Sequence, residues 1–168
     1  MIELGLYAGL RVQEMSSLKI RDLIIHGNHS SIVVREGKGG KRRDVWINSA
    51  FKQVCREFLN IRKSFDLPDA PDNMLLVSGQ GRALSTRALE KAFKKCLSAA
   101  GLLETYSIHC LRHTYATFSL AAGVDIRFLQ EQLGHASIKT TELYLALLHD
   151  QNRRALEGLY KTRKGVKT

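Results

Sequence analysis

Residues 22–47 constrain the fold most, because they form the part of the chain whose pattern is typical of β-strands. Arg43, Val45 and Ile47 alternate with Asp44, Trp46 and Asn48, and a glycine-rich turn at residues 37–40 precedes them. We predict strands at residues 23–25, 31–35 and 43–47. Short strands joined by short turns pair in antiparallel fashion, so the sequence predicts a small three-stranded antiparallel sheet.

The rest of the chain has the apolar spacing of helices. We predict helices at residues 2–18, 49–65, 86–100, 107–122 and 125–133, and another that begins at Ser137 and runs past Tyr144. Ser85 is a candidate N-cap, while Gly123 and Gly134 stand where helices end. Both prolines mark a loop at residues 67–72, and residues 75–77 match a brief strand. The predicted fold class is therefore α+β and mainly α-helical.

Length and composition indicate one globular domain. The chain has 168 residues, of which 44% are hydrophobic and 25% charged. It shows neither an apolar run of the roughly 20 residues that a membrane span needs nor a signal-peptide pattern. Its three cysteines, Cys55, Cys96 and Cys110, are an odd number without close pairing. We expect a cytoplasmic protein with reduced thiols, no disulfide framework and no zinc site.

The charge balance favours a polyanionic partner. Lys and Arg number 26 against 16 Asp and Glu, which gives a net charge of +10 and a pI near 9.8. Charge alone does not separate a nucleic-acid-binding protein from a merely basic one.

Short motifs whose side chains are candidates for catalysis stand in a fixed order along the chain. They are GLRVQEM at residues 9–15, Lys38 in the glycine-rich turn, HCLRH at 109–113, LGH at 133–135 and TTELY at 140–144. On a helix His109 and Arg112 are three residues apart and face the same way. One helix can therefore present an imidazole and a guanidinium to one phosphate.

Together these motifs resemble the active site of the tyrosine recombinases of the phage integrase family. Members of that family carry a GLR-x-x-E-type helix, a lysine on a β-hairpin, an H-x-x-R helix, an LGH motif and a T-T-x-x-Y nucleophile. The resemblance spans residues 2–144. It implies the tyrosine-recombinase catalytic-domain fold over residues 1–160, followed by a basic tail at residues 161–168.

The resemblance also implies a reaction. Tyr144 would attack the scissile phosphodiester to form a 3′-phosphotyrosyl link and a free 5′-hydroxyl, and strand exchange would follow. Tyrosine has an ordinary pKa near 10, so activation is required. Lys38 is the expected general acid for the leaving hydroxyl, although Lys41 lies in the same turn and a hairpin lysine often serves solubility.

Four further residues complete the implied active site. Arg11 and Arg112 would bind the phosphate and stabilise the charge of the transition state. The resemblance assigns His109 as the general base and His135 as a hydrogen-bond partner of the scissile phosphate.

Other candidates receive plainer interpretations. We assign Arg87, Arg127 and the Arg42/Arg43 pair to solvent or to contacts with the phosphate backbone, and His113 to helix packing or to support of the site. The sequence holds no carboxylate cluster of the kind that two-metal phosphoryl transfer uses, and no P-loop. We expect no metal, no ATP and no other cofactor.

The implied partner is double-stranded DNA with a specific recombination site, bound by a homotetramer, with an accessory DNA-bending protein as a further partner. Residues 145–161 are apolar-patterned and suited to packing between protomers, and no membrane partner is expected. We expect this chain to lack the helical domain that usually precedes the catalytic one in the family, and we therefore expect weak, salt-sensitive DNA binding. Two alternatives stay open: a type IB topoisomerase-like enzyme that reseals the same strand, and a non-catalytic DNA-binding remnant.

Overall fold

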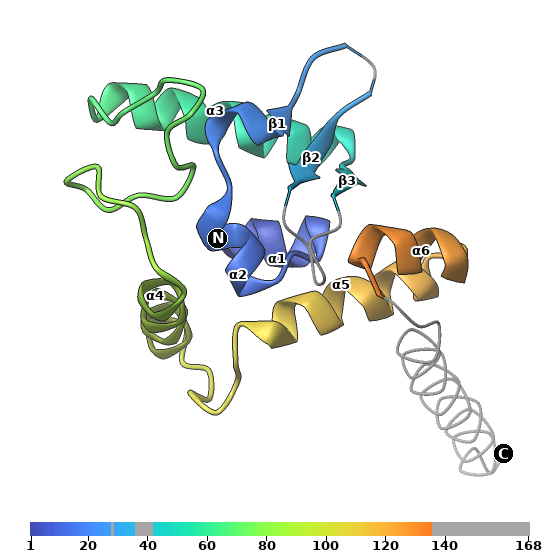
Figure 1. Cartoon of the computed structure of the whole chain (residues 1–168). Coiled ribbons are helices and arrows are strands. Elements are labelled where there is room, and N and C mark those ends of the chain that lie inside the picture. The colour runs from blue at the N-terminus through green and yellow to red at the C-terminus, as the bar shows by residue number, and fades with distance from the viewer. Residues whose placement is uncertain (28, 36–41, 136–168) are drawn as a thin grey trace, which may run out of the picture.

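The structure is a computed structural model that describes residues 1–27, 29–35 and 42–135. It confirms the predicted fold class, because helices form most of the described chain and one small antiparallel sheet lies at one side (Figure 1). The elements, in chain order, are α1 (Ile2–Ala8), α2 (Val12–Ser17), the short 3-10 helix η1 (Ile20–Asp22), β1 (Leu23–Ile24), β2 (Ser31–Val34), β3 (Arg43–Trp46), α3 (Ser49–Ser64), α4 (Thr86–Ala99), α5 (His109–Ala121) and α6 (Ile126–Leu133).

The sheet has the predicted three antiparallel strands. Strand β2 lies between β1 and β3 and is antiparallel to both. Its register pairs Ser31 with Trp46 and Val34 with Arg43, so Arg43 begins its strand directly opposite the end of β2. All four β2 residues are buried. Lys38 and the predicted turn around it lie outside the described residues.

The single helix predicted over residues 2–18 is wrong, because two helices occupy this stretch. Gly9 ends α1 in the left-handed conformation, with φ +60°. A Cβ at Gly9 would lie 2.4 Å from Cδ1 of Tyr115 and 2.9 Å from Cδ2 of Leu133, so the backbone packs directly against α5 and α6. The chain turns here and places Arg11 at the N-cap of α2.

The later helices begin and end within two residues of their predicted bounds. Asn48 caps α3 through a hydrogen bond from the Phe51 amide, and the side chains of Ser85 and Asp125 cap α4 and α6. Helix α5 has its N-cap at Ile108. The predicted strand at residues 75–77 is an isolated bridge between Val77 and Ala83. The helix predicted from Ser137 lies outside the described residues.

The core has two parts. The larger part packs α1, the sheet, α3 and α4 around buried side chains that include Leu4, Leu10, Ile32, Phe51 and Leu89. The smaller joins α5 to α6 through Ala116, Leu129 and Leu133. Because α5 lies along α1 while α6 contacts β3, the ends of several elements meet beside α6 (Figure 1).

The free cysteine thiols and the lengths of the helices are typical of a globular protein. Cys55, Cys96 and Cys110 are free, and burial raises the pKa of the Cys55 thiol to about 11. Within the described ranges, no helix is both long enough and apolar enough to cross a membrane.

Candidate active site

Arg11 and Glu14 form the first part of the site, at the N-terminus of α2. The main-chain N–H of Arg11 donates to Oε2 of Glu14 at 2.8 Å, and its Nη1 donates to Oε1 at 2.9 Å. The three-residue spacing is that of an N-cap and the N3 carboxylate that reaches back to it. Glu14 is only 3% exposed, so this pair holds the Arg11 guanidinium close to the protein.

Arg43 binds the same carboxylate from the other side. Its Nη1 and Nη2 donate to the two Glu14 oxygens at 2.8 and 2.9 Å, and its Nε donates to the Gln132 carbonyl at 2.9 Å. The prediction that Arg43 faces solvent or the phosphate backbone is therefore wrong: its side chain is 12% exposed and is engaged by protein. Arg43 shares the inward side of β3 with Val45, two residues on, and this two-residue spacing was the signal for its burial. Arg42, Arg87 and Arg127 are exposed, as predicted.

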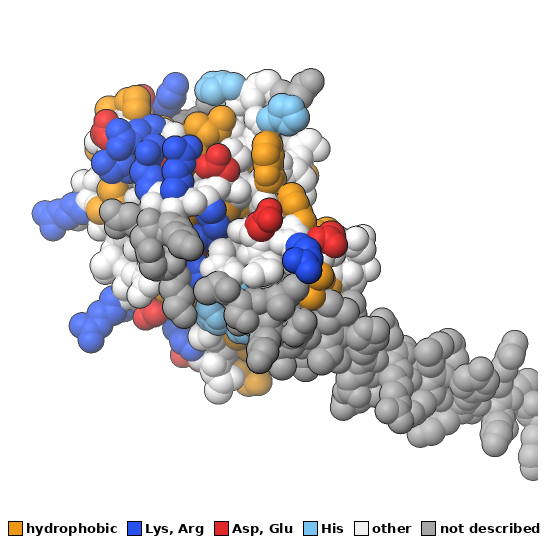
Figure 2. Space-filling view, turned by 45° about the vertical axis from the view of Figure 1, so that its right-hand side comes forward, with side chains coloured by type: hydrophobic (Ala, Val, Ile, Leu, Met, Phe, Trp, Pro, Cys, Tyr) orange, Lys and Arg blue, Asp and Glu red, His pale blue; other side chains and the backbone are white. Residues whose placement is uncertain are grey.

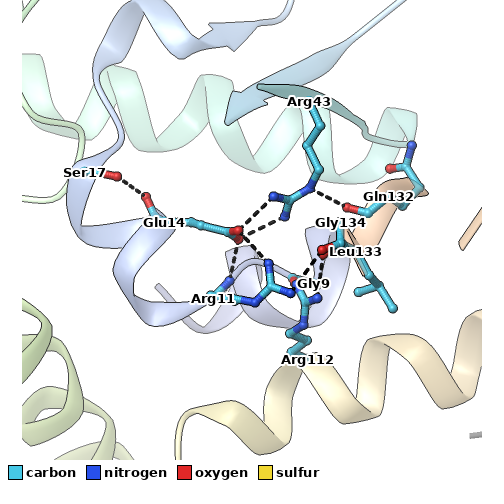
Figure 3. A network of polar contacts seen from close by, with 9 residues as sticks. All are labelled: Gly9, Arg11, Glu14, Ser17, Arg43, Arg112, Gln132, Leu133 and Gly134. Carbon is cyan, nitrogen blue, oxygen red and sulfur yellow. Dashed lines mark hydrogen bonds and ion pairs between the residues drawn. The ribbon is translucent and has the colours of Figure 1, made fainter. Parts of the chain in front are cut away.

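The C-terminus of α6 is the point where three arginines meet (Figure 3). Three successive carbonyls there each accept a bond from a different arginine: Gln132 from Arg43, Leu133 from Arg112, and Gly134 from Arg11 at 3.3 Å. The last carbonyls of a helix have no partners within the helix and carry partial negative charge. The end of α6 thus gathers guanidinium groups from α2, β3 and α5.

Arg112 is the most deeply buried of the three. Its side chain is 1% exposed, and its two terminal nitrogens donate to the Gly9 carbonyl at 2.5 Å and the Leu133 carbonyl at 2.6 Å. These two bonds fix the plane of the guanidinium. The left-handed turn at Gly9 is what presents that carbonyl to Arg112.

His135 directly follows the carbonyl cluster. Its main-chain N–H donates to the Gln130 carbonyl, and its own carbonyl accepts from the Gln130 side chain. Burial first, and then the charges of Arg112, Arg11 and Arg43, lower the pKa of His135 to about 4. The imidazole is therefore neutral at neutral pH and can both accept and donate a hydrogen bond.

His109 lies on α5, one turn before Arg112. Burial lowers its pKa, and the charges of His113, Arg112 and Arg11 lower it further. The rings of His109 and His113 are in edge-to-face contact, with centroids 4.7 Å apart, which agrees with a supporting position for His113. A neutral His109 can accept a proton at neutral pH.

The structure brings four of the six predicted site residues near one another: Arg11, Arg112 and His135 meet at the end of α6, and His109 lies one turn before Arg112 on α5. Lys38 and Tyr144 lie outside the described residues. Sequence reasoning missed the structural part played by Glu14 and Arg43. Figure 2 shows several Lys and Arg side chains gathered on one part of this face, with other Lys and Arg and a few Asp and Glu scattered over it. At the end of α6, the guanidinium groups of Arg11 and Arg112 suit an anion with several oxygen atoms.

Comparison with known proteins gives a family-level match. A family model described as "Phage integrase family" matches residues 1–151. Tyrosine recombinase XerC of Thermodesulfovibrio yellowstonii is 34% identical over 149 residues, which are 85% of this chain and 48% of that protein. Tyrosine recombinase XerA of Pyrococcus horikoshii is 38% identical over 152 residues, with 89% and 50% covered. The chain spans about half the length of these relatives.

Solved structures match the fold. The crystal structure of XerA recombinase aligns with a TM-score of 0.76 and 34% identity, over 98% of this chain and 57% of that one. The XerH site-specific recombinase, bound to palindromic difH substrate in a post-cleavage complex, aligns with a TM-score of 0.73 and 28% identity. That alignment covers 92% of this chain and 43% of the other.

Proposed function

Because the chain belongs to the phage integrase family, we propose that it is the catalytic domain of a site-specific DNA recombinase that cleaves and rejoins strands through Tyr144. The observation that carries the proposal is that Arg11, Arg112 and His135 meet at the end of α6, with His109 one turn before Arg112 on α5. Support also comes from the XerH site-specific recombinase, whose structure is a post-cleavage complex with its difH substrate.

Arg11 and Arg112 bind the phosphate. Attack on a phosphodiester builds charge on the non-bridging oxygens, and fixed guanidinium groups stabilise that charge without reorganising. Arg112 is held by two carbonyls and Arg11 by Glu14, so both enter the reaction with their orientation set. By analogy with oxyanion donors, each contributes about 10²- to 10³-fold in rate.

Proton transfer falls to His109 and Lys38. The Tyr144 oxygen forms a bond to phosphorus while its proton passes to His109, which is neutral because its pKa is lowered. The bond from phosphorus to the 5′ oxygen breaks, and Lys38 supplies the proton for the leaving hydroxyl. His135 donates a hydrogen bond to the phosphate. Attack by another strand's 5′-hydroxyl reverses these steps, and the phosphotyrosyl bond conserves the energy of the diester.

The proposed partner is double-stranded DNA that carries a specific recombination site. Exchange of two duplexes requires four cleaved strands, and so a tetramer on DNA. We place residues 145–161 between protomers in that assembly and include an accessory DNA-bending protein among the partners.

The test uses short duplexes of random sequence, each with one nick that lets the cleaved fragment diffuse away. Adducts that resist denaturant are recovered and their DNA is sequenced. We expect a covalent adduct on a defined sequence, none with Tyr144→Phe, and losses of at least about 10²-fold with Arg11→Ala or Arg112→Ala. Saturating binding without adduct would contradict the proposal and favour the non-catalytic remnant. Plasmid relaxation without strand exchange between selected sites would favour the topoisomerase-like alternative.

A further inference from the structure

Arg43 occupies a position in the site that phosphate binding does not explain. It begins β3, and each of its three guanidinium nitrogens donates a hydrogen bond to protein. Its neighbour Arg42 is 64% exposed and lies 3.6 Å from Asp44. The two adjacent arginines therefore differ in accessibility and in what they bind, and Arg43 points away from solvent toward α2 and α6 (Figure 3).

Arg43 first binds Glu14, the carboxylate that also holds Arg11. Each Glu14 oxygen accepts one bond from Arg11 and one from Arg43. The carboxylate is thus held in one orientation between the two residues. Without Arg43, Glu14 can rotate, and Arg11 then keeps its long 3.3 Å bond to Gly134 as its other anchor.

The second link is to the residues just before His135. Gln132 accepts from the Arg43 side chain through its carbonyl and from the Trp46 amide through Oε1, so both ends of β3 bind one residue of α6. Gly134 packs against Arg43, since a Cβ there would lie 3.0 Å from Nη1. The end of α6 is therefore fixed against the sheet.

We propose that Arg43 is a positioning residue: it holds β3, the start of α2 and the end of α6 in one arrangement, so that Arg11 and His135 address the same phosphate. This inference rests on the proposed recombinase function. It concerns orientation and predicts that loss of Arg43 slows the chemistry far more than it weakens DNA binding.

The test compares Arg43→Lys with the matched control Arg42→Lys, which changes the adjacent exposed arginine in the same way. The probe is the nicked duplex recovered from the random pool, and the measurements are its affinity and the rate of adduct formation at saturating protein. Misplacement by about 1 Å costs about 10²-fold in rate, so we expect a loss of about 10- to 100-fold for Arg43→Lys at nearly unchanged affinity. Arg42→Lys keeps the wild-type rate. Weakened affinity at a normal saturating rate would overturn the proposal and make Arg43 a phosphate contact.

A second variant covers the case in which Arg43→Lys does not fold. Gln132→Met keeps the main-chain carbonyl and the side-chain volume but removes the acceptor for the Trp46 amide. It loosens the same link without removing a charge. A slower saturating rate with retained affinity supports the proposal, and a wild-type rate contradicts it.

A measurement without DNA separates this inference from the proposed function. Absence of adduct with the unaltered chain counts against the function alone. Amide NMR spectra then decide the structural claim: we expect Arg43→Lys to shift the Gly134 and His135 resonances and Arg42→Lys to leave them in place. A folded Arg43→Lys protein with both resonances unmoved would overturn the positioning claim.

Discussion

Glu14 is a buried carboxylate that stays charged because two arginines surround it. Burial alone raises the pKa of a carboxyl group, but here the hydrogen bonds and charge of Arg43, together with the main-chain bond and charge of Arg11, lower the pKa of Glu14. The anion is thus the centre that keeps two cations close to each other, and the cluster retains an excess of positive charge for a phosphate.

Substitution Glu14→Gln should therefore be strongly destabilising. It keeps the shape but leaves Arg11 and Arg43 beside a neutral group, and loss of one partner of a buried ion pair costs about 3–5 kcal/mol. Urea unfolding measures the free energy. The control Asp44→Asn removes an exposed partner of Arg42 and should cost at most about 1 kcal/mol. Equal losses in the two variants would show that Glu14 contributes no more than a surface ion pair.

His135 should make stability depend on pH between about 6.5 and 4. Its pKa is about 4 in the folded chain and 6.5 ordinarily, so the unfolded chain binds the proton more readily. The stability it provides is complete above pH 6.5 and is lost as pH falls toward 4. We expect a loss of about 1–2 kcal/mol, allowing for solvent screening of a half-buried ring. The measurement is unfolding by urea across this range. His135→Gln should flatten the curve, whereas His26→Gln, at an exposed position, should not.

At the scale of elements, the break between α1 and α2 creates the site. Gly9 turns the chain so that its carbonyl faces Arg112 and Arg11 becomes the N-cap of α2. A continuous helix would use the Gly9 carbonyl in its own ladder and would carry Arg11 away from α6. The left-handed turn and the binding of two arginines are therefore one feature.

Substitution Gly9→Ala tests that feature. The methyl group meets Tyr115 and Leu133, and the residue must also adopt φ +60°. The conformational cost of about 1–2 kcal/mol adds to about 1–3 kcal/mol of overpacking. Gly27→Ala is the matched control, because Gly27 has φ +63° but no atom within 4 Å of the added Cβ, so only the conformational cost applies. Thermal and urea unfolding should give a much lower free energy of unfolding for Gly9→Ala than for Gly27→Ala. Similar free energies would mean that α5 and α6 shift to make room for the methyl group without loss of stability.

Local signals were sufficient to predict most elements but not this break. Helices α3, α4 and α6 follow from apolar spacing and from caps such as Ser85 and Asp125, and the sheet follows from alternation around Val45. The spacing of Ile2, Leu6 and Leu10 runs through the break, so periodicity alone predicted one helix. The signal that marks the break is Gly9, whose conformation depends on the packing of α5 and α6.

At the scale of the whole molecule, the site is assembled from residues 9 to 135 and exists only in the folded chain. Motif order identified Arg11, His109, Arg112 and His135 as one group, and the structure brings them together. What the sequence did not predict is their common anchor, the row of carbonyls after Glu131, because that depends on how α6 meets β3. Arg43 was grouped with Arg42 because the two are adjacent, although alternation along β3 separates them.

The net charge of +10 leads to the last prediction, which concerns salt. Binding to DNA releases counterions, so affinity falls with salt, whereas the chemical step occurs after the phosphate contacts have formed. For about four phosphates neutralised by this chain, we expect affinity for the selected duplex to fall about 10²-fold between about 50 and about 200 mM salt. Because Arg112 and Arg11 are held by protein groups, the rate of adduct formation at saturating protein should change little. The rate of adduct formation is measured as a function of protein concentration at several salt concentrations. Each titration gives both the affinity for the duplex and the rate at saturating protein. If the rate of adduct formation at saturating protein fell in parallel with affinity, salt would be disrupting the arginine cluster itself.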